Sequence, residues 1–221
     1  MTDLDNRRPL KVRDTGWAKD FAARLAKAHV TPDLISLLGV VIAALGATFL
    51  AMAGVLPPIA RALLLLLAAA CIQGRLVCNL LDGMVAVEHG KGSSDGPIWN
   101  ELPDRFSDAL LLTGAGFMLA GLGWRIGSSL GWVAAILAII TAYVRELGRG
   151  LGLPADFTGP MAKQQRMAAL TAGCILSALE PLWNGAGEMM LIVMAVIVVG
   201  TGWTIARRVA NVAAGLKAKG G

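Results

Sequence analysis

The chain alternates long apolar runs with short polar connections. Six runs can be marked, at residues 34–54, 59–81, 104–123, 128–146, 164–182 and 187–207. Each is close to the ~20 residues that an α-helix needs to cross the hydrocarbon core of a bilayer. With 56% hydrophobic and 16% charged residues, the chain has too little polar sequence to coat a soluble domain. The pattern predicts an all-α integral membrane protein with six transmembrane helices.

A shorter apolar stripe precedes the first run. Its members recur at helical spacing: Trp17, Phe21, Ala22, Leu25 and Ala26. We expect an N-terminal amphipathic interfacial helix here, and a helix packed on the bundle is the equal alternative. Thr31-Pro32-Asp33 then provides a helix start. The chain is thus divided into a cytoplasmic N-terminal segment (1–30), a six-helix membrane domain (31–210) and a cytoplasmic tail (211–221).

Lysine and arginine gather in the connections on one side of the predicted bundle. If the N-terminus is cytoplasmic, only Arg61 and Arg125 lie on the opposite side. The positive-inside rule then predicts that both termini are cytoplasmic, in a bacterial-type inner membrane. The net charge of +5 is explained by attraction to an anionic inner leaflet, and no nucleic-acid partner is expected.

The polar residues that break the apolar pattern gather where the second run ends and the third begins. Helical spacing places Asn79 and Asp82 on one face of the first of these helices. It places Asn100, Asp104 and Asp108 on one face of the next. Because such side chains are costly at a hydrocarbon boundary unless they bind something, this stretch is the default functional site.

These residues resemble the CDP-alcohol phosphatidyltransferase family. The family pattern is Asp-x-x-Asp-Gly-x-x-Ala-Arg, a spacer of eight or nine residues, then Gly-x-x-x-Asp-x-x-x-Asp. The matching positions here are Asn79, Asp82, Gly83, Ala86, Val87, Gly96, Asn100 and Asp104. The resemblance implies a phospholipid-synthesis enzyme that moves a phosphatidyl-type group from a CDP-linked lipid to a small alcohol acceptor and releases CMP.

The resemblance also assigns roles to residues. Asp104 would be the general base, and a divalent cation, Mg²⁺ or Mn²⁺, would be held by Asp82, Asp104, Asn79 and Asn100. Substrate-binding positions would be Gly83, Ala86, Gly96, Arg145, Lys163 and Arg166. A homodimer is implied as well. The glycines of the third run, Gly114, Gly116, Gly121 and Gly123, fit either a dimer face or ordinary helix packing.

The chain departs from the family pattern at three positions. Asn79 and Asn100 replace aspartates, and Val87 replaces the arginine. An amide oxygen can ligate Mg²⁺ but brings no charge, so we expect one cation instead of two.

Several neighbouring residues are candidates to compensate. Asp108 is a possible further ligand, Glu88 or Glu101 a possible source of charge, and Arg75 a possible electrostatic substitute for the second cation. Structural alternatives stand beside these: Asp108 pairs with Arg105 or caps a helix, and Arg75 pairs with Asp82. Arg145, Lys163 and Arg166 would then be positive-inside anchors.

The sequence is compatible with two functions, one of an enzyme and one of a binding protein. The first is the metal-assisted transferase implied by the resemblance. The second is a degenerate member that binds a CDP-lipid or lipid phosphate without turnover, as a sensor or partner subunit. A transporter is less favoured, because the polar residues gather at one membrane face and not at the midplane.

Overall fold

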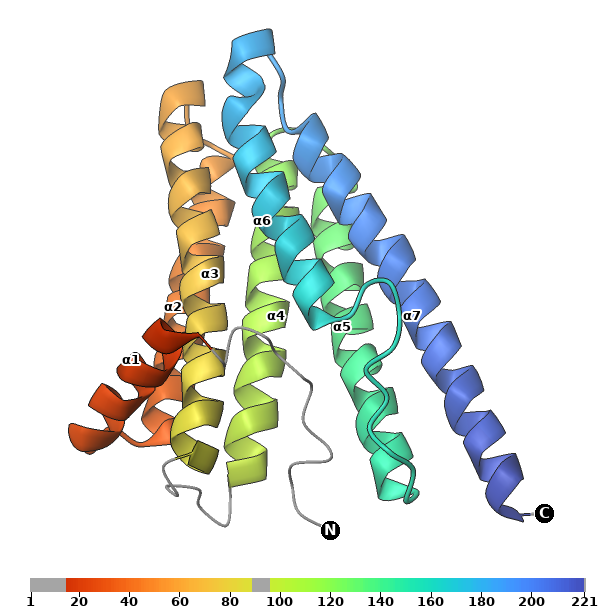
Figure 1. Ribbon diagram of the computed structural model, residues 1–221. Coiled ribbons are helices and arrows are strands. Elements are labelled where there is room, and N and C mark those ends of the chain that lie inside the picture. The colour runs from red at the N-terminus through yellow and green to blue at the C-terminus, as the bar shows by residue number, and fades with distance from the viewer. Residues whose placement is uncertain (1–14, 89–95, 221) are drawn as a thin grey trace.

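A computed structural model describes residues 15–88 and 96–220, and this part of the chain is helical throughout its regular structure. The helices are α1 (Gly16–Lys27), α2 (Pro32–Ala53), α3 (Pro58–Glu88), α4 (Gly96–Gly121), α5 (Gly127–Gly150), α6 (Lys163–Leu179) and α7 (Glu188–Gly220), with a 3-10 turn, η3 (Glu180–Trp183), after α6. Figure 1 shows the long helices running side by side. The all-α prediction is confirmed for the described residues.

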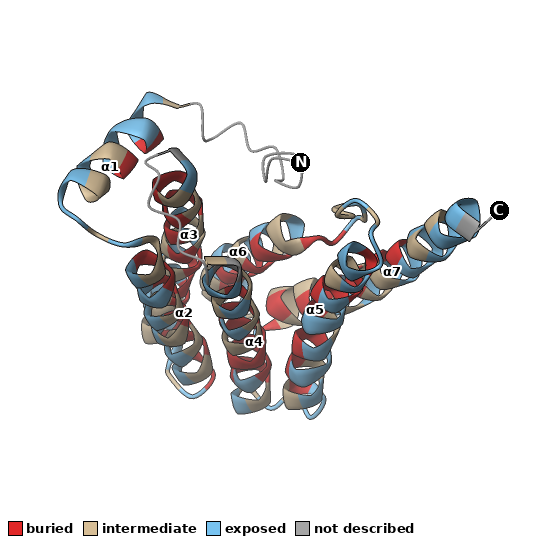
Figure 2. Cartoon of the chain, turned by 90° about the horizontal axis from the view of Figure 1, so that it is seen from below, coloured by how far each residue is buried: buried red, intermediate tan, exposed pale blue. Residues whose placement is uncertain are grey.

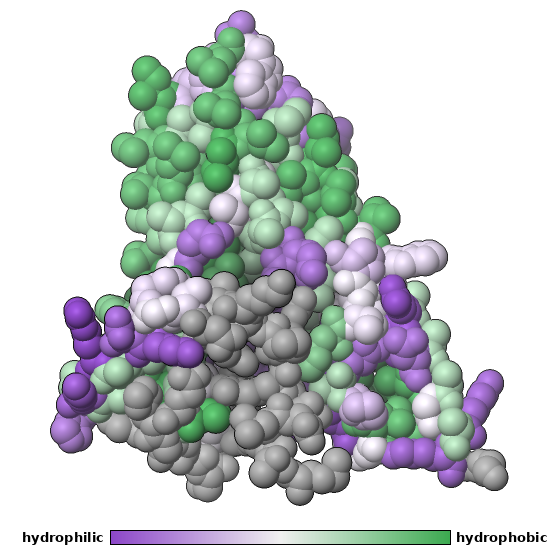
Figure 3. All heavy atoms as spheres, viewed as in Figure 1, coloured by the Kyte–Doolittle hydropathy of each residue, from purple (hydrophilic) through white to green (hydrophobic). Residues whose placement is uncertain are grey.

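The helices α2 to α7 form a closed ring. Contacts run from α3 to α2, then to α4, α5 and α7, and return through α6 to α3; Figure 2 looks along this ring. Apolar side chains from all of these helices fill its interior, among them Leu50, Ile72, Leu111, Ala134, Leu170 and Met194. Figure 3 shows that the upper part of one face is largely hydrophobic, whereas hydrophilic residues gather lower down. The polar groups therefore lie toward one end of the ring.

Four helices are long and apolar enough to cross a membrane: α2, α3, α5 and α7. They support an integral membrane protein. The other two predicted spans correspond to α4, whose first half is polar, and α6, which has 17 residues. At 1.5 Å per residue, α6 is only about 26 Å long, somewhat shorter than the ~30 Å hydrocarbon core.

Two helices extend well past their apolar runs. The helix α3 continues to Glu88 instead of ending at 81, and α7 continues to Gly220 instead of 207. A helix does not have to end where the hydrocarbon ends, because it satisfies its own backbone groups in water as well. Hydropathy locates the membrane-embedded part of a helix and not its full length.

The N-terminal stripe forms α1, which packs against α3. Ala18 and Ala22 are fully buried against apolar residues such as Met84 and Val85, whereas Trp17 and Phe21 remain about half exposed. The packed alternative is therefore observed. The interfacial position of α1 stays a prediction.

The glycines of α4 make contacts within the chain. A Cβ on Gly114 would lie 2.7 Å from the carbonyl oxygen of Ala47 in α2, and one on Gly116 would lie 2.6 Å from the Cα of Gly131 in α5. Gly121 meets Gly54 in the same way. Close approach of neighbouring backbones thus explains these three positions without a dimer.

We predict that Gly116→Ala destabilises the bundle by about 1–3 kcal/mol, because the added methyl group forces α4 away from α5. Thermal unfolding in detergent measures this. Gly202→Ala is the matched control, since a Cβ at this helical glycine meets nothing within 4 Å. Equal melting temperatures for the two variants would contradict the prediction.

Candidate functional site

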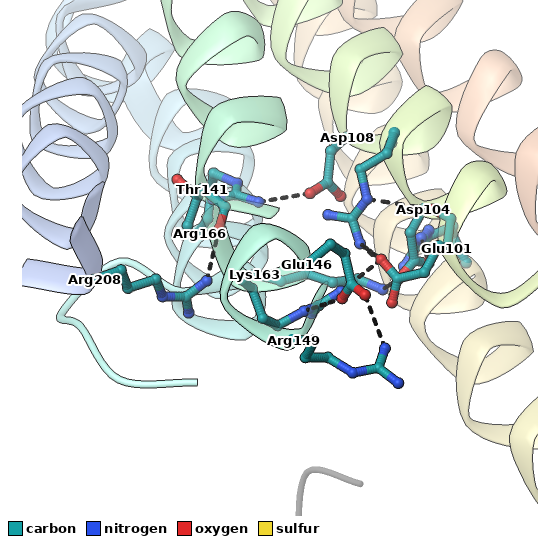
Figure 4. A network of polar contacts seen from close by, with 12 residues as sticks. Glu101, Asp104, Asp108, Thr141, Glu146, Arg149, Lys163, Arg166 and Arg208 are labelled. Carbon is teal, nitrogen blue, oxygen red and sulfur yellow. Dashed lines mark hydrogen bonds and ion pairs between the residues drawn. The ribbon is translucent and has the colours of Figure 1, made fainter. Parts of the chain in front are cut away.

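Three buried carboxylates lie inside the ring toward its polar end. Asp82 comes from α3, six residues before that helix ends, and Asp104 and Asp108 come from one face of α4. Opposing them are three basic side chains: Arg75 from α3, and Lys163 and Arg166 from the first turns of α6. Figure 4 shows the α4 and α6 members of this acid-base cluster facing one another.

Asp104 is held between two cations. Arg75 donates to its Oδ1 and Lys163 donates to its Oδ2, while Arg105 lies 3.9 Å away. The expectation that Arg75 pairs with Asp82 is wrong, because its guanidinium crosses from α3 to α4. Asp104 thereby links three helices, and the predicted base is engaged on both oxygens.

Asp82 has neutral partners. The hydroxyl of Ser36, in the second turn of α2, donates to its Oδ2 at 2.6 Å, and the backbone N–H of Gly83 donates to Oδ1 at 2.5 Å. Asp104 repels its charge, and Lys163 attracts it. The sequence pattern gave no reason to select Ser36, since a serine in an apolar run is usually a packing residue.

Asp108 pairs with Arg166 at 2.6 Å, and both side chains are only 1% exposed. The alternative pairing of Asp108 with Arg105 is wrong. Arg105 instead contacts Glu101, one helical turn away on α4, at 2.8 Å. An ion pair this deeply buried is stable only because each charge compensates the other.

A second, more exposed ion-pair network lies beside the cluster, between α4 and α5. Glu101 accepts from Arg145 of α5 at 2.5 Å, and Arg145 also contacts Glu146 at 2.8 Å. The guanidinium of Arg145 lies 5.5 Å from the centre of the Phe157 ring. Arg145 is therefore committed to carboxylates of the chain itself, and Glu101 supplies charge to this network and not to Asp82.

The connection between α5 and α6 sets the position of Lys163 and Arg166. Figure 1 shows that it runs from the lower end of α5 up to the first residue of α6, which begins well inside the bundle. The helix α7 holds this connection with polar side chains. Arg208 donates to the carbonyl oxygens of Thr158 and Thr141, each at 2.9 Å, and Thr204 accepts from the N–H of Met161 at 3.0 Å.

Asp156, within the connection itself, adds a further contact to α7. It accepts from the backbone N–H of Thr158 at 2.8 Å and from the side chain of Asn211 at 2.9 Å. Partial burial works to raise the pKa of Asp156, but these hydrogen bonds outweigh it, so the pKa lies below its usual value. The sequence reading missed this anchoring face, although Thr201, Thr204, Arg208 and Asn211 recur at helical spacing along α7.

The other predicted positions lie on the same two helices. Asn79, Gly83 and Ala86 are partly buried on the last turns of α3, and Gly96 begins α4. Asn100 belongs to α4, but its side chain lies outside the described part of the structure, as does that of Glu88. The structure thus gathers Arg75, Asp82, Asp104, Asp108, Lys163 and Arg166 into one cluster, with Arg145 beside it.

These donors fit a single divalent ion better than a pair. Among the described residues, no three His, Cys, Asp or Glu side chains are placed to hold a metal ion together. Asp82 and Asp104 are the two carboxylates that resemblance assigns to metal, and Arg75 and Lys163 already engage the second of them. A two-ion site needs more negative charge than this set supplies.

Polar atoms without a protein partner also mark the cluster. Within the described chain, five buried side-chain atoms make no hydrogen bond: Nη1 of Arg75, Oδ1 of Asp108 and Nε of Arg166 belong to the cluster, and Nε of Arg61 and Oγ1 of Thr201 lie elsewhere. Buried polar atoms in native proteins are nearly always satisfied by the chain, by water or by a bound group. The three atoms in the cluster are therefore available to a polar ligand.

Known proteins are similar to this chain in sequence and in fold. No protein-family model matches it. A bifunctional IPC transferase and DIPP synthase of Rubrobacter xylanophilus is 33% identical over 155 residues, which is 67% of this chain and 32% of that protein. A phosphatidylinositol phosphate synthase of Cutibacterium acnes is 31% identical over 150 residues, which is 63% of this chain and 65% of that protein. The chain belongs to the CDP-alcohol phosphatidyltransferase family.

Solved structures agree on the fold of this family. The phosphatidylinositol phosphate synthase of Mycobacterium tuberculosis with CDP-DAG bound superposes with a TM-score of 0.74 at 20% identity, over 88% of this chain and 92% of that one. The same enzyme in complex with manganese and citrate gives 0.73 at 21% identity, over 88% of both chains. The family assignment rests on the sequence relatives. Of those, this chain spans about a third of the Rubrobacter protein and 65% of the Cutibacterium protein.

We predict that Arg166→Met and Asp108→Leu each destabilise the protein by about 3–5 kcal/mol, because each leaves a buried charge unpaired. The double variant should recover most of this loss. The unfolding midpoints of the native chain, the two single variants and the double variant in detergent measure the coupling energy of the pair. Arg149→Met is the control, since its pair with Glu146 is exposed and contributes little. Purely additive single effects would contradict a coupled buried pair.

Proposed function

We propose that this chain transfers a phosphatidyl-type group from a CDP-linked lipid to an alcohol acceptor and releases CMP. The observation that carries the proposal is the convergence of Asp82, Asp104 and Lys163 at the polar end of a ring of apolar helices. Such a site admits a nucleotide headgroup from one side of the membrane while the lipid tails stay in the bilayer. Family membership and the relatives' names supply the reaction class.

The chain's own groups suffice to describe the transfer. The acceptor hydroxyl oxygen attacks the lipid-linked phosphorus of the donor, its proton passes to a carboxylate oxygen of Asp104, and the bond from that phosphorus to the CMP oxygen breaks. Asp104 must first release one of its contacts, since Arg75 and Lys163 engage both oxygens. Lys163, once released, is placed to balance charge that develops on the phosphoryl oxygens.

A divalent ion would be held by Asp82 and Asn79, together with Asp104 and Asn100, which the resemblance also assigns to metal. When bound, the ion neutralises charge on the donor diphosphate. Manganese is present in one structure of the M. tuberculosis enzyme, which makes Mn²⁺ the first ion to test beside Mg²⁺.

The acceptor is proposed from the relatives and from the basic residues. Two of the similar proteins are named phosphatidylinositol phosphate synthase, so a phosphorylated inositol is the first acceptor to test. Arg145 beside the cluster is suited to a phosphate group, provided that the phosphate displaces Glu101 or Glu146.

The proposal includes the membrane arrangement. All six helices of the ring would span the bilayer, α4 and α6 included, with both termini and the site on the cytoplasmic side of a bacterial-type inner membrane. The membrane domain would cover 31–210. A homodimer is proposed from the family alone, because the glycines of α4 are already used within the chain.

A second candidate is a non-catalytic family member that binds a CDP-lipid or lipid phosphate as a sensor or partner subunit. The observation that favours it is the double engagement of Asp104 by Arg75 and Lys163. A carboxylate held by two cations is a weaker proton acceptor than a free one. Asn79 and Asn100 also favour a non-catalytic member, because they bring less negative charge for binding a metal ion than aspartates would.

We predict that the purified chain in lipid nanodiscs releases CMP from CDP-diacylglycerol only with Mg²⁺ or Mn²⁺ and an acceptor. Asp104→Asn should lower the rate at least about 100-fold, the scale of a lost general base. Glu188→Gln is the matched carboxylate control at the far end of the bundle, where Glu188 accepts from the backbone N–H of Ala186. Undiminished CMP release by Asp104→Asn would remove Asp104 from the role of base.

The Asn79→Asp/Asn100→Asp double variant separates the two candidates. If the native chain is an enzyme, it releases CMP before any substitution. If only the double variant releases CMP while both proteins bind the donor equally, the native chain is a binder.

A further inference from the structure

Two buried arginines lie on α3, and they have different surroundings. Arg61 is 6% exposed near the start of the helix and donates to the carbonyl oxygen of Gly185 at 3.2 Å, and its Nε is buried without a hydrogen-bond partner. Arg75 is 2% exposed, fourteen residues further along, and it is paired with Asp104. A charge buried in an apolar bundle is costly, so each needs a compensating partner or a function. For Arg75, the partner is the predicted base of the reaction.

The guanidinium of Arg75 is only partly used. Its Nη2 contacts Asp104, whereas Nη1 is buried and has no partner among the described residues. Guanidinium is planar and always charged, and it binds phosphate oxygens through two adjacent N–H groups. An unpartnered N–H beside Asp104 is therefore well suited to an anionic oxygen of a ligand.

The balance of charge points the same way. Asp82, Asp104 and Asp108 carry three negative charges, and Arg75, Lys163 and Arg166 carry three positive charges. The acid-base cluster is thus neutral before any metal ion binds. Aspartate at positions 79 and 100 would add two negative charges to this set, which would then attract metal ions before it could accept a diphosphate.

We propose that Arg75 binds the diphosphate of the CDP-linked donor and supplies the positive charge that a second metal ion would otherwise bring. The inference rests on the proposed donor and deepens it, because it assigns a donor-binding residue outside the family pattern. Relative to the family pattern, two negative charges are absent at Asn79 and Asn100, one positive charge is absent at Val87, and Arg75 supplies a fixed positive charge. The chain needs at most one divalent ion.

The test measures binding of CDP, and of CDP-diacylglycerol in zwitterionic nanodiscs, by calorimetry in the presence of EDTA. The native chain should bind CDP without any divalent ion. Arg75→Gln should weaken this binding at least about tenfold, as expected for a lost charge-assisted contact, and Arg75→Lys should restore part of it. Arg61→Gln is the matched control, a buried arginine of the same helix, and should leave CDP binding unchanged. Titration with Mn²⁺ followed by electron paramagnetic resonance should count about one ion per chain.

Three results would overturn the inference: CDP binding by Arg75→Gln equal to that of the native chain, no CDP binding by the native chain until metal is added, or two tightly bound Mn²⁺ ions. If Arg75→Gln fails to fold, the Arg75→Gln/Asp104→Asn double variant is used in its place, because it removes both charges of the pair. Unchanged CDP binding by that variant also overturns the inference. Arg75-dependent CDP binding without CMP release would sustain it while excluding the transferase.

Discussion

The arrangement of the site depends on one carboxylate, Asp104, which is bonded to Arg75 on one side and to Lys163 on the other. The consecutive helices α3 and α4 meet the distant helix α6 at this residue, and each contributes a charge that would be costly if it were alone. The apolar ring determines where the helices stand. The paired charges fix which faces of α3, α4 and α6 point inward, because any other rotation leaves one of them unpaired.

The short helix α6 extends the same constraint to the rest of the chain. Lys163 reaches Asp104 because α6 begins inside the bundle and not at its lower end. The connection that precedes it must therefore enter the ring, where its backbone groups require partners that lipid cannot provide. Arg208 and Thr204 of α7 provide them. The polar face of α7 is thus needed because Lys163 lies opposite Asp104 of α4.

Sequence patterns predicted what is local to one helix and missed what forms between helices. The run at 34–54 matched α2 within two residues, and the spacing of Asp82 and Asp104 correctly placed both carboxylates on inward faces. The pairing of Arg75 was wrong because it was sought on the same helix, two turns away, whereas the contact crosses the ring. Ser36 was missed for the same reason, since nothing in an apolar run distinguishes a serine that faces a carboxylate.

The altered aspartates gain a physical explanation from the pairing of Asp104. A diphosphate ligand has to be neutralised, whether by metal ions that carboxylates collect or by cations built into the protein. The occupancy of bound metal ions depends on their concentration in solution. A buried guanidinium is always present, and the free energy needed to bury it is supplied when the protein folds. With Arg75 between α3 and α4, two further carboxylates near Asp82 would add attraction for metal but also new pairing partners for the guanidinium. Under the proposal for Arg75, asparagine at 79 and 100 would keep an amide oxygen at each position and leave the charge of Arg75 to the diphosphate.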